Sequence, residues 1–378
     1  SRSRSDKRVS RSAPITAPGR KITVRKEALR LLGEHRGPGS VPALQAALAA
    51  PGLHKDVAIA IGHAARNLLD DPRALAILAQ LAGSPEPDVA RSLLGPRPDL
   101  LPAAARPAYA TLVRQLARHP DHSTRSAAIL ALPTWSFGQE AILADDLVAH
   151  LLDLRSDTWD EANTALVAIA SGGRCGPALA RAAAGLAALP DPGDPERDLP
   201  ARQRLCALCE ALRDQQTPGQ RIAQRRDLEH VAAALIADDL WPLAADLRIT
   251  GLDLADPTSA RPLLDLAADA RADLFLTELV ACLERQIAAC TAIADAAALL
   301  RLATALLAGP ATAARLGLAL IAAAGARDRW SDAARDALAP LRRHPDLRVR
   351  HAALQVFTRR EAPAAGIDDE DPDSYFDD

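Results

Sequence analysis

The chain has 378 residues, of which 49% are hydrophobic and only 3% are aromatic, so alanine and leucine must supply most of the core. It has no run of about 18 or more apolar residues and it begins with charged residues, which argues against a transmembrane helix or a signal peptide. Five cysteines without a secretion signal fit reduced thiols, so we expect a cytoplasmic protein. An arginine-rich, lysine-poor composition is typical of a GC-rich bacterial genome.

The formal net charge of −3 is unevenly distributed along the chain. Residues 1–26 hold nine Lys and Arg against one Asp, whereas residues 361–378 hold eight acids and no base. Segments this polar cannot bury enough apolar surface to fold alone. We therefore expect a basic disordered arm at 1–23, a folded region at 24–360 and an acidic disordered tail at 361–378.

The folded region consists of amphipathic segments with helical periodicity, joined by short turns, and no segment has the alternation of a strand. We expect a first helix at 24–35, followed by pairs at 40–49/55–69, 71–82/86–94, 106–118/121–134, 140–154/157–171, 176–189/199–214, 220–237/241–255, 258–269/272–288, 291–308/310–325 and 328–343/346–360.

Two proline-rich stretches interrupt this pattern. The first, GPRPDLLP (95–102), is expected to end a short second helix, because proline cannot continue one. The second, PDPGDPERDLP (190–200), carries four prolines within eleven residues. We expect the second stretch to be an exposed, semi-rigid loop.

The tripeptide His-Pro-Asp occurs twice, in HPDHSTRSAAILAL (119–132) and in HPDLRVRHAALQVF (344–357). The same tripeptide is functional in the chaperone J-domain, which needs one copy between two specific helices. Two copies in equivalent positions of a helical repeat instead favour a structural role for the tripeptide. Proline ends one helix, and Asp121 or Asp346 caps the next by accepting from its free N–H groups.

Helix–turn–helix units that recur every 34–45 residues or so are typical of an α-solenoid. The pattern in PDLRVRHAAL (345–354) resembles the HEAT-repeat family. The resemblance implies an all-α fold, a right-handed α-solenoid of about nine HEAT-like helix pairs. It also implies polar ladders between repeats from Asp121/Arg125 and Asp346/Arg350, and a break where the central repeats lack such a pair.

No motif in the sequence assembles a catalytic, cofactor or metal site. CALC (206–209) lies within a helical pattern and has no second cysteine pair to complete a zinc site. No phosphate-binding glycine loop, nucleophile elbow or His-Glu-x-x-His spacing occurs. We therefore predict no enzyme, no cofactor and no metal.

One enzymatic relative of the fold offers an alternative. HEAT-like DNA glycosylases for alkylated bases use Trp, Asp and Arg on a concave surface, and Trp159 lies beside Asp157 and Asp160. Such a groove is basic because it binds phosphates, whereas the middle of this chain is slightly acidic.

The predicted function is a non-catalytic protein-binding scaffold, adaptor or regulatory module that uses the concave face. Nucleic-acid binding through the basic arm is the alternative, and no membrane is involved. In the tail, Tyr375 and Phe376 could dock on a partner. The other candidate partner-binding residues are Arg91, Arg125, Trp159, Arg348 and Arg350. The arginines could instead serve the ladders within the chain, with Arg348 the most free to face outward.

Overall fold

A computed structural model describes residues 21–135, 140–171, 176–189, 194–235, 237–356 and 358. Every regular element in these ranges is a helix, and no strand occurs in them, as the periodicity predicts. The chain divides into two compact units, Ser1–Ala211 and Leu212–Asp378. In the described part, no helix combines the length and the apolar character needed to traverse a bilayer.

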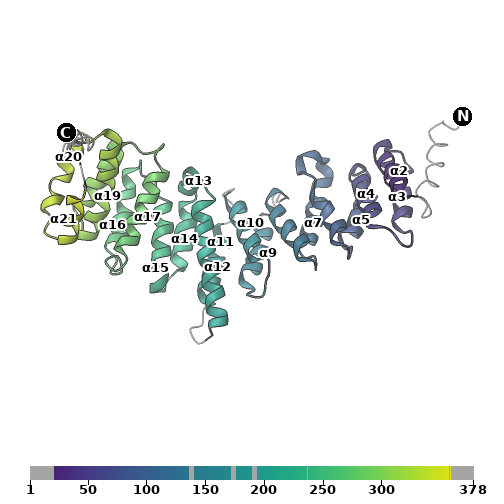
Figure 1. The fold of residues 1–378 in the computed structure, drawn as a ribbon, viewed down its shortest axis with the longest axis horizontal. Coiled ribbons are helices and arrows are strands. Elements are labelled where there is room, and N and C mark those ends of the chain that lie inside the picture. Colours follow the sequence, from purple (N-terminus) through teal and green to yellow (C-terminus); the bar gives the residue numbers. More distant parts are fainter. Residues whose placement is uncertain are drawn as a thin grey trace, which may run out of the picture. The chain divides into compact units, whose positions relative to one another are not determined.

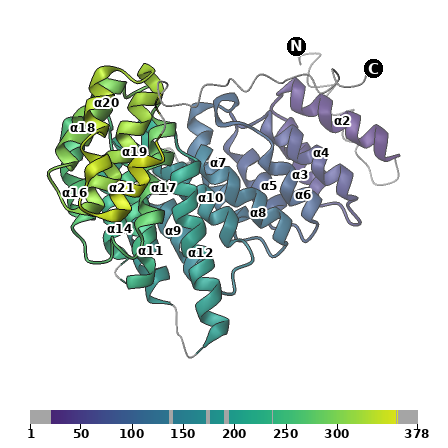
Figure 2. The same ribbon diagram turned by 60° about the vertical axis from the view of Figure 1, so that its left-hand side comes forward.

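The first unit places its helices in two rows. They are α2 (Ile22–His35), α3 (Ser40–Leu48), α4 (Lys55–Arg66), α5 (Pro72–Ala82), α6 (Pro87–Arg91), α7 (Arg106–Leu116), α8 (His122–Ala131), α9 (Glu140–Leu152), α10 (Trp159–Ala170) and α11 (Gly176–Ala188). In the first row, α3 contacts α5, α5 contacts α7, and α9 contacts α11. In the second row, α2, α4, α6, α8 and α10 contact one another in that order (Figure 2).

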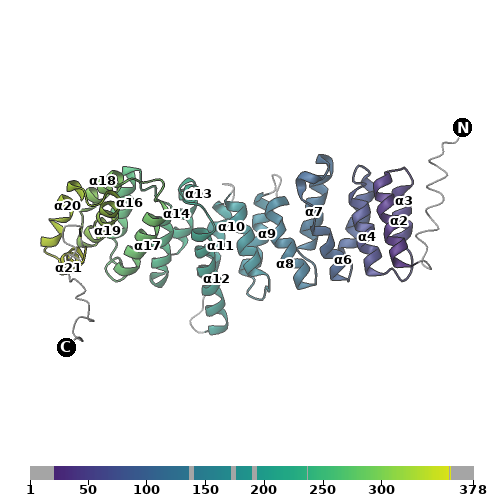
Figure 3. The same cartoon turned by 45° about the horizontal axis from the view of Figure 1, so that its top comes forward.

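The second unit repeats the two-row pattern. Helix α12 (Pro195–Asp214) spans the boundary, and then come α13 (Pro218–Ala223), α14 (Arg225–Ala234), α15 (Trp241–Thr250), α16 (Ala260–Ala267), α17 (Leu276–Ala289), α18 (Ala296–Leu306), α19 (Ala311–Asp328), α20 (Asp332–Leu338) and α21 (Leu347–Leu354). Helices α16, α18 and α20 form one row, and α15, α17, α19 and α21 form the other (Figures 1 and 3).

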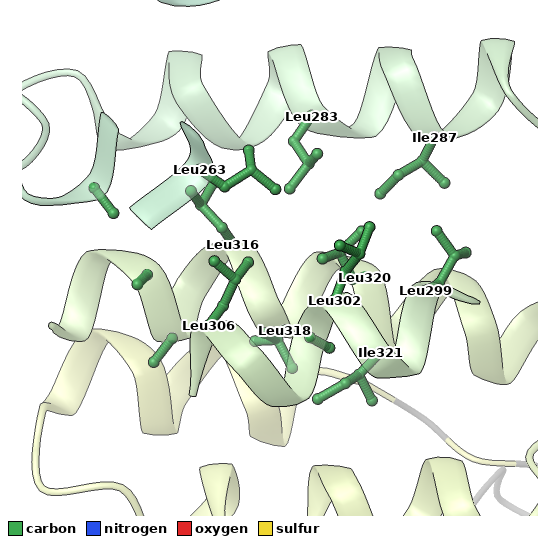
Figure 4. Packing of buried hydrophobic residues seen from close by; sticks show 14 of the residues in the cluster. Leu263, Leu283, Ile287, Leu299, Leu302, Leu306, Leu316, Leu318, Leu320 and Ile321 are labelled. Carbon is green, nitrogen blue, oxygen red and sulfur yellow. The ribbon is translucent and has the colours of Figure 1, made fainter. Parts of the chain in front are cut away.

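Aliphatic side chains fill the space between the rows of the second unit. Leu283 of α17, Leu302 of α18 and Leu320 of α19 are each at most 1% exposed and lie close together in Figure 4. Burying one such side chain contributes about 1.5–3 kcal/mol. Because every helix shares its apolar stripe with neighbours on two sides, a single helix pair could not bury its own surface.

The two His-Pro-Asp tripeptides form the same turn. Asp121 Oδ2 accepts from Thr124 N at 2.8 Å, and Asp346 Oδ1 accepts from Arg348 N at 2.8 Å, so both aspartates cap helices as predicted. The Nδ1 atoms of His119 and His344 each accept the amide of the aspartate two residues on, at 3.1 Å in both turns. The repeated tripeptide therefore forms the turn that precedes and caps a helix.

Two predicted boundaries were wrong. Residues 220–237 were expected as one helix, but the chain breaks at Gln224 between α13 and α14. The buried Gln224 side chain accepts from Gln216 Nε2 at 3.1 Å, a tertiary contact that a hydrophobic pattern does not reveal. In the expected loop 190–200, residues 195–200 instead begin α12. Pro195 is the first helical residue and needs no N–H partner, whereas Pro200 lies inside the helix. Residues 190–193 lie outside the described residues.

Two more predicted helices are shorter in the structure, since 241–255 ends at Thr250 and 328–343 contains only Asp332–Leu338 as α-helix. Other boundaries agree more closely with the sequence. Helix α6 ends at Arg91 and short 3₁₀ turns follow, as the prolines of 95–102 predict. Helix α2 begins at Ile22, two residues before the expected start of the folded region. The arm up to residue 20 and the tail 361–378, with Tyr375 and Phe376, lie outside the described residues.

Candidate interaction surface

Polar contacts join successive second-row helices in the first unit, mostly near their N-terminal ends. Lys55 Nζ lies 2.8 Å from Asp88 Oδ2, and Arg125 Nη2 donates to both oxygens of Asp157 at 2.7 and 2.6 Å. Between these pairs, Arg91 donates to Ser123 Oγ at 2.9 Å. We call these contacts the second-row ladder. The predicted candidates Arg91 and Arg125 both belong to it.

Arg125 is held more firmly than the other members of the ladder. Its side chain is 17% exposed, and its Nη1 donates to the carbonyls of His119 at 2.7 Å and Pro120 at 3.1 Å. The hydrogen bond from Arg125 holds the pKa of Asp157 below its usual value. The side chain therefore ties a turn to the next helix, which is the intramolecular role that the resemblance implied.

Trp159 and Asp160 begin α10 without forming an open aromatic site. Trp159 is half-buried, and the Arg204 guanidinium lies 5.3 Å from its ring centroid. Arg204 is itself 3% exposed and donates to the carbonyls of Leu151 at 2.8 Å and Asp153 at 2.7 Å. Since Asp157 is paired with Arg125, two of the residues required by the glycosylase alternative are engaged in internal contacts.

Arg348 and Arg350 lie in the second unit, at the start of α21. Arg348 was expected to be freer to face outward than the other arginines, and its side chain is 51% exposed, although its Nη2 lies 3.3 Å from Asp273 Oδ1 and 3.4 Å from Asp346 Oδ2. Asp273 lies before α17 and 75 residues earlier in the chain, so the pair depends on the packing of α17 against α19 and of α19 against α21. Arg350 is half-buried and donates to the His344 carbonyl at 3.5 Å. The structure does not place these two arginines with Arg91, Arg125 and Trp159, which belong to the other unit.

Sequence reasoning missed an open groove on the first row of the first unit. A hollow of about 600 Å³ follows the end of α5 and the face of α7, and a second hollow of about 230 Å³ continues over α9. Arg118 borders both, and we call the pair the first-row groove. Its lining includes Ala82, Pro85, Thr111, Arg114, Gln115, Arg118, Pro120, Asp146 and His150.

One carboxylate is shared by the two arginines of the first-row groove. Asp146 Oδ2 accepts from Arg114 Nη2 at 2.7 Å, and Asp146 Oδ1 accepts from Arg118 Nη2 at 3.3 Å. The Arg118 side chain is 70% exposed. The signal in the sequence was the step of 32 residues from Arg114 to Asp146, the same step that separates Arg125 from Asp157.

Three of the cysteines among the described residues lack the environment of a nucleophile. Burial, and then the Asp246 charge, raises the pKa of the Cys282 thiol to about 12, and burial also raises the pKa values of Cys206 and Cys290. A thiol in that state carries little thiolate at neutral pH. The CALC pair lies on α12, as the periodicity predicts, and the described residues contain no group of three or more potential metal ligands.

Comparisons with known proteins add little. No protein-family model matches the chain, and no curated protein matches it. Among solved structures, the chain is similar to a crystal structure of an engineered protein, with 17% sequence identity and a TM-score of 0.36. The alignment covers 92% of this chain and 97% of that one. A TM-score this low supports no assignment of fold family or function.

Proposed function

We propose that the chain is a right-handed, HEAT-like α-solenoid that serves as a non-catalytic, cytoplasmic protein-binding scaffold, adaptor or regulatory module. The two-row packing inside each unit supports this architecture. So does the regular step of the second-row ladder, whose contacts join residues 33, 32 and 32 positions apart. Repeated helix pairs of this kind present a long face to partners.

The first-row groove is the observation that carries the proposal. It is open to solvent and follows three successive helices, so an extended or helical segment of a protein fits it better than an enclosed small molecule would. Ala82, Pro85 and Pro120 supply apolar surface, and the exposed Gln115 and Arg118 supply polar groups beside it. A hydrophobic centre with a polar rim is the usual anatomy of a protein interface.

The mixed charge of the groove favours a protein over a nucleic acid. Phosphate binding requires cations that are free to replace counterions, whereas Arg114 and Arg118 already share Asp146 and Arg125 already pairs with Asp157. The nucleic-acid alternative therefore depends mainly on the charge of residues 1–26.

Site-specific photo-crosslinking in the native cell tests the proposal. A photoreactive amino acid at Gln115 should capture one stoichiometric protein partner, and Arg118→Glu should reduce the yield by about tenfold, since a reversed rim charge repels the complementary group. The matched control places the same crosslinker at Leu130, which is 47% exposed on α8 of the other row. Equal capture from both positions, or a nuclease-sensitive product at Gln115, would contradict the proposal.

A further inference from the structure

A hollow of about 500 Å³ in the second unit is bordered by three arginines from three helices. Arg225 begins α14, Arg248 lies near the end of α15, and Arg261 lies in the first turn of α16. We call this hollow the arginine groove. Three separate helices thus bring guanidinium groups to one open site.

The guanidinium groups of the arginine groove keep donors available for a ligand. Arg225 and Arg261 use Nε to reach Glu229 and Asp265, each at 2.9 Å and each on the same helix. Their terminal nitrogens have no hydrogen-bond partner among the residues described in this unit, and the half-buried Arg248 has no partner there at all. Guanidinium groups with free terminal nitrogens bind carboxylates with two parallel hydrogen bonds.

The rest of the lining favours a ligand that also carries apolar groups. Glu229 and Asp265 also line the groove, each already paired with an arginine of its own helix. Pro262 and Leu266 border the groove too, and the exposed Thr258 lies beside them. Arginine and proline surfaces both accept aromatic rings, the former through cation–π contact. The groove therefore suits a peptide that combines several carboxylates with an aromatic residue.

We propose that the arginine groove binds the acidic tail of this same chain, residues 361–378. The tail EAPAAGIDDEDPDSYFDD carries eight acids, no base and the pair Tyr375-Phe376, so its charge and its aromatic content both match the groove. Residues 359–378 can span about 65 Å when extended, more than enough to reach a site within one unit.

Covalent attachment makes the tail a strong competitor for the groove. A tethered segment acts at an effective concentration in the millimolar range, so even a weak site is filled in cis. An acidic segment of another protein must displace the tail before it binds here. This proposal is independent of the scaffold function, which concerns the groove of the other unit.

Fluorescence anisotropy with a labelled peptide of residues 361–378 tests the proposal. The receptor is the full chain with its eight tail acids changed to Asn or Gln, and it should bind the peptide saturably at low salt. Arg248→Glu and Arg261→Glu should each weaken binding by about tenfold, because each removes a carboxylate partner and adds a repulsive charge. The Arg261 side chain is 82% exposed, so that variant should fold normally.

Two further measurements test the proposal: a control arginine outside the groove, and the chain with its own tail unaltered. Arg301 is an exposed arginine on α18 outside the groove, and Arg301→Glu should leave the affinity unchanged. The unaltered chain should bind the added peptide about tenfold more weakly than the receptor, because its own tail competes in cis. Absence of binding, an equal loss with Arg301→Glu, or equal affinity of the two chains would overturn the proposal. None of these results bears on crosslinking at Gln115.

Discussion

The second-row ladder of the first unit and the contacts among α15, α17 and α19 of the second unit use different interactions. The second-row ladder consists mainly of exposed ion pairs, such as Lys55–Asp88, whose side chains are 48% and 45% exposed. Around α15, α17 and α19, the buried Gln286 and the half-buried Arg327 bond to backbone carbonyls. Gln286 Nε2 donates to the Leu252 carbonyl at 2.9 Å, and Arg327 donates to the carbonyls of Ala294 and Ile287.

The carboxylates show the same contrast. Asp246 in the second unit is 12% exposed and accepts from Arg213 at 3.1 Å and from Arg285 at 3.0 Å, whereas Asp157 in the first unit is 55% exposed. Exposed pairs are screened by salt and contribute little, while a buried carboxylate is costly when its partners are lost. The same helix packing is thus compatible with salt-sensitive and with salt-resistant polar contacts between helices.

The largest expected effect is that of removing the Asp246 carboxylate. Asp246→Ala leaves Arg213 and Arg285 without their shared partner, and it should destabilise the second unit by about 3 kcal/mol. Hydrogen exchange of peptides from α15 and α17 measures the change locally. As a control, Asp265→Ala breaks an exposed pair of the same unit and should cost less than about 0.5 kcal/mol. A similar loss of stability in both variants would contradict the contrast between buried and exposed ion pairs.

The second-largest expected effect is the destabilisation caused by Gly325→Ala, because Gly325 packs against Trp330. A Cβ atom on Gly325 would lie 2.6 Å from the ring of Trp330, which is 8% exposed and has a left-handed backbone with φ of 62°. Overpacking of this kind costs about 2 kcal/mol, so Gly325→Ala should speed exchange in α19 and α20. Gly219→Ala in α13, where no atom lies within 4 Å of the new Cβ, should instead be neutral or slightly stabilising. Destabilisation by both variants would point to a cause other than crowding.

Arg125→Ala should have a smaller effect, confined to the first unit. It removes the bonds to Asp157 and to two carbonyls, and we expect a loss of about 1–2 kcal/mol in exchange protection of α8 and α10. In about 1 M NaCl, where the Debye length is about 3 Å, the part of the loss that comes from the exposed Asp157 should shrink. Arg301→Ala is the control, because Arg301 is exposed on α18, outside the arginine groove, and its loss should not change protection in α18. Loss of α18 protection in that variant would show a contact that the structure does not have.

The smallest expected effect is the pH dependence of the stability that the second-row ladder contributes. The hydrogen bond from Arg125 lowers the pKa of Asp157, and that from Lys55 lowers the pKa of Asp88. A carboxyl whose folded pKa is lowered stabilises the fold above its unfolded pKa of about 3.9 and loses that contribution as the pH falls below it. Thermal melts should therefore show the difference in Tm between the wild type and Arg125→Ala narrowing from pH 6 to pH 3 or so. A difference that stays constant would assign the effect of Arg125 to its carbonyl bonds alone.

Much of the fold could be predicted from local chemistry. Asp121 and Asp346 cap the helices expected of them, and α6 ends at Arg91, with a 3₁₀ turn over the rest of the expected segment up to residue 94, before the prolines. The site was less predictable, because Arg118 and Asp146 look like any solvated pair until α7 and α9 are placed side by side. The aspartate doublet 145–146 could not be distinguished from an exposed face on sequence grounds.

The sequence by itself determined which segments are helical and where most of them begin and end, because caps, prolines and apolar periodicity act over a few neighbouring residues. Only the tertiary structure decided the partners of the charged side chains. Arg348 pairs with Asp273 across 75 residues, and Gln224 ends a helix by bonding to Gln216. Such contacts depend on how helices are packed, and an arginine that can bind carboxylates, carbonyls or a ligand equally well has no local signal for its choice.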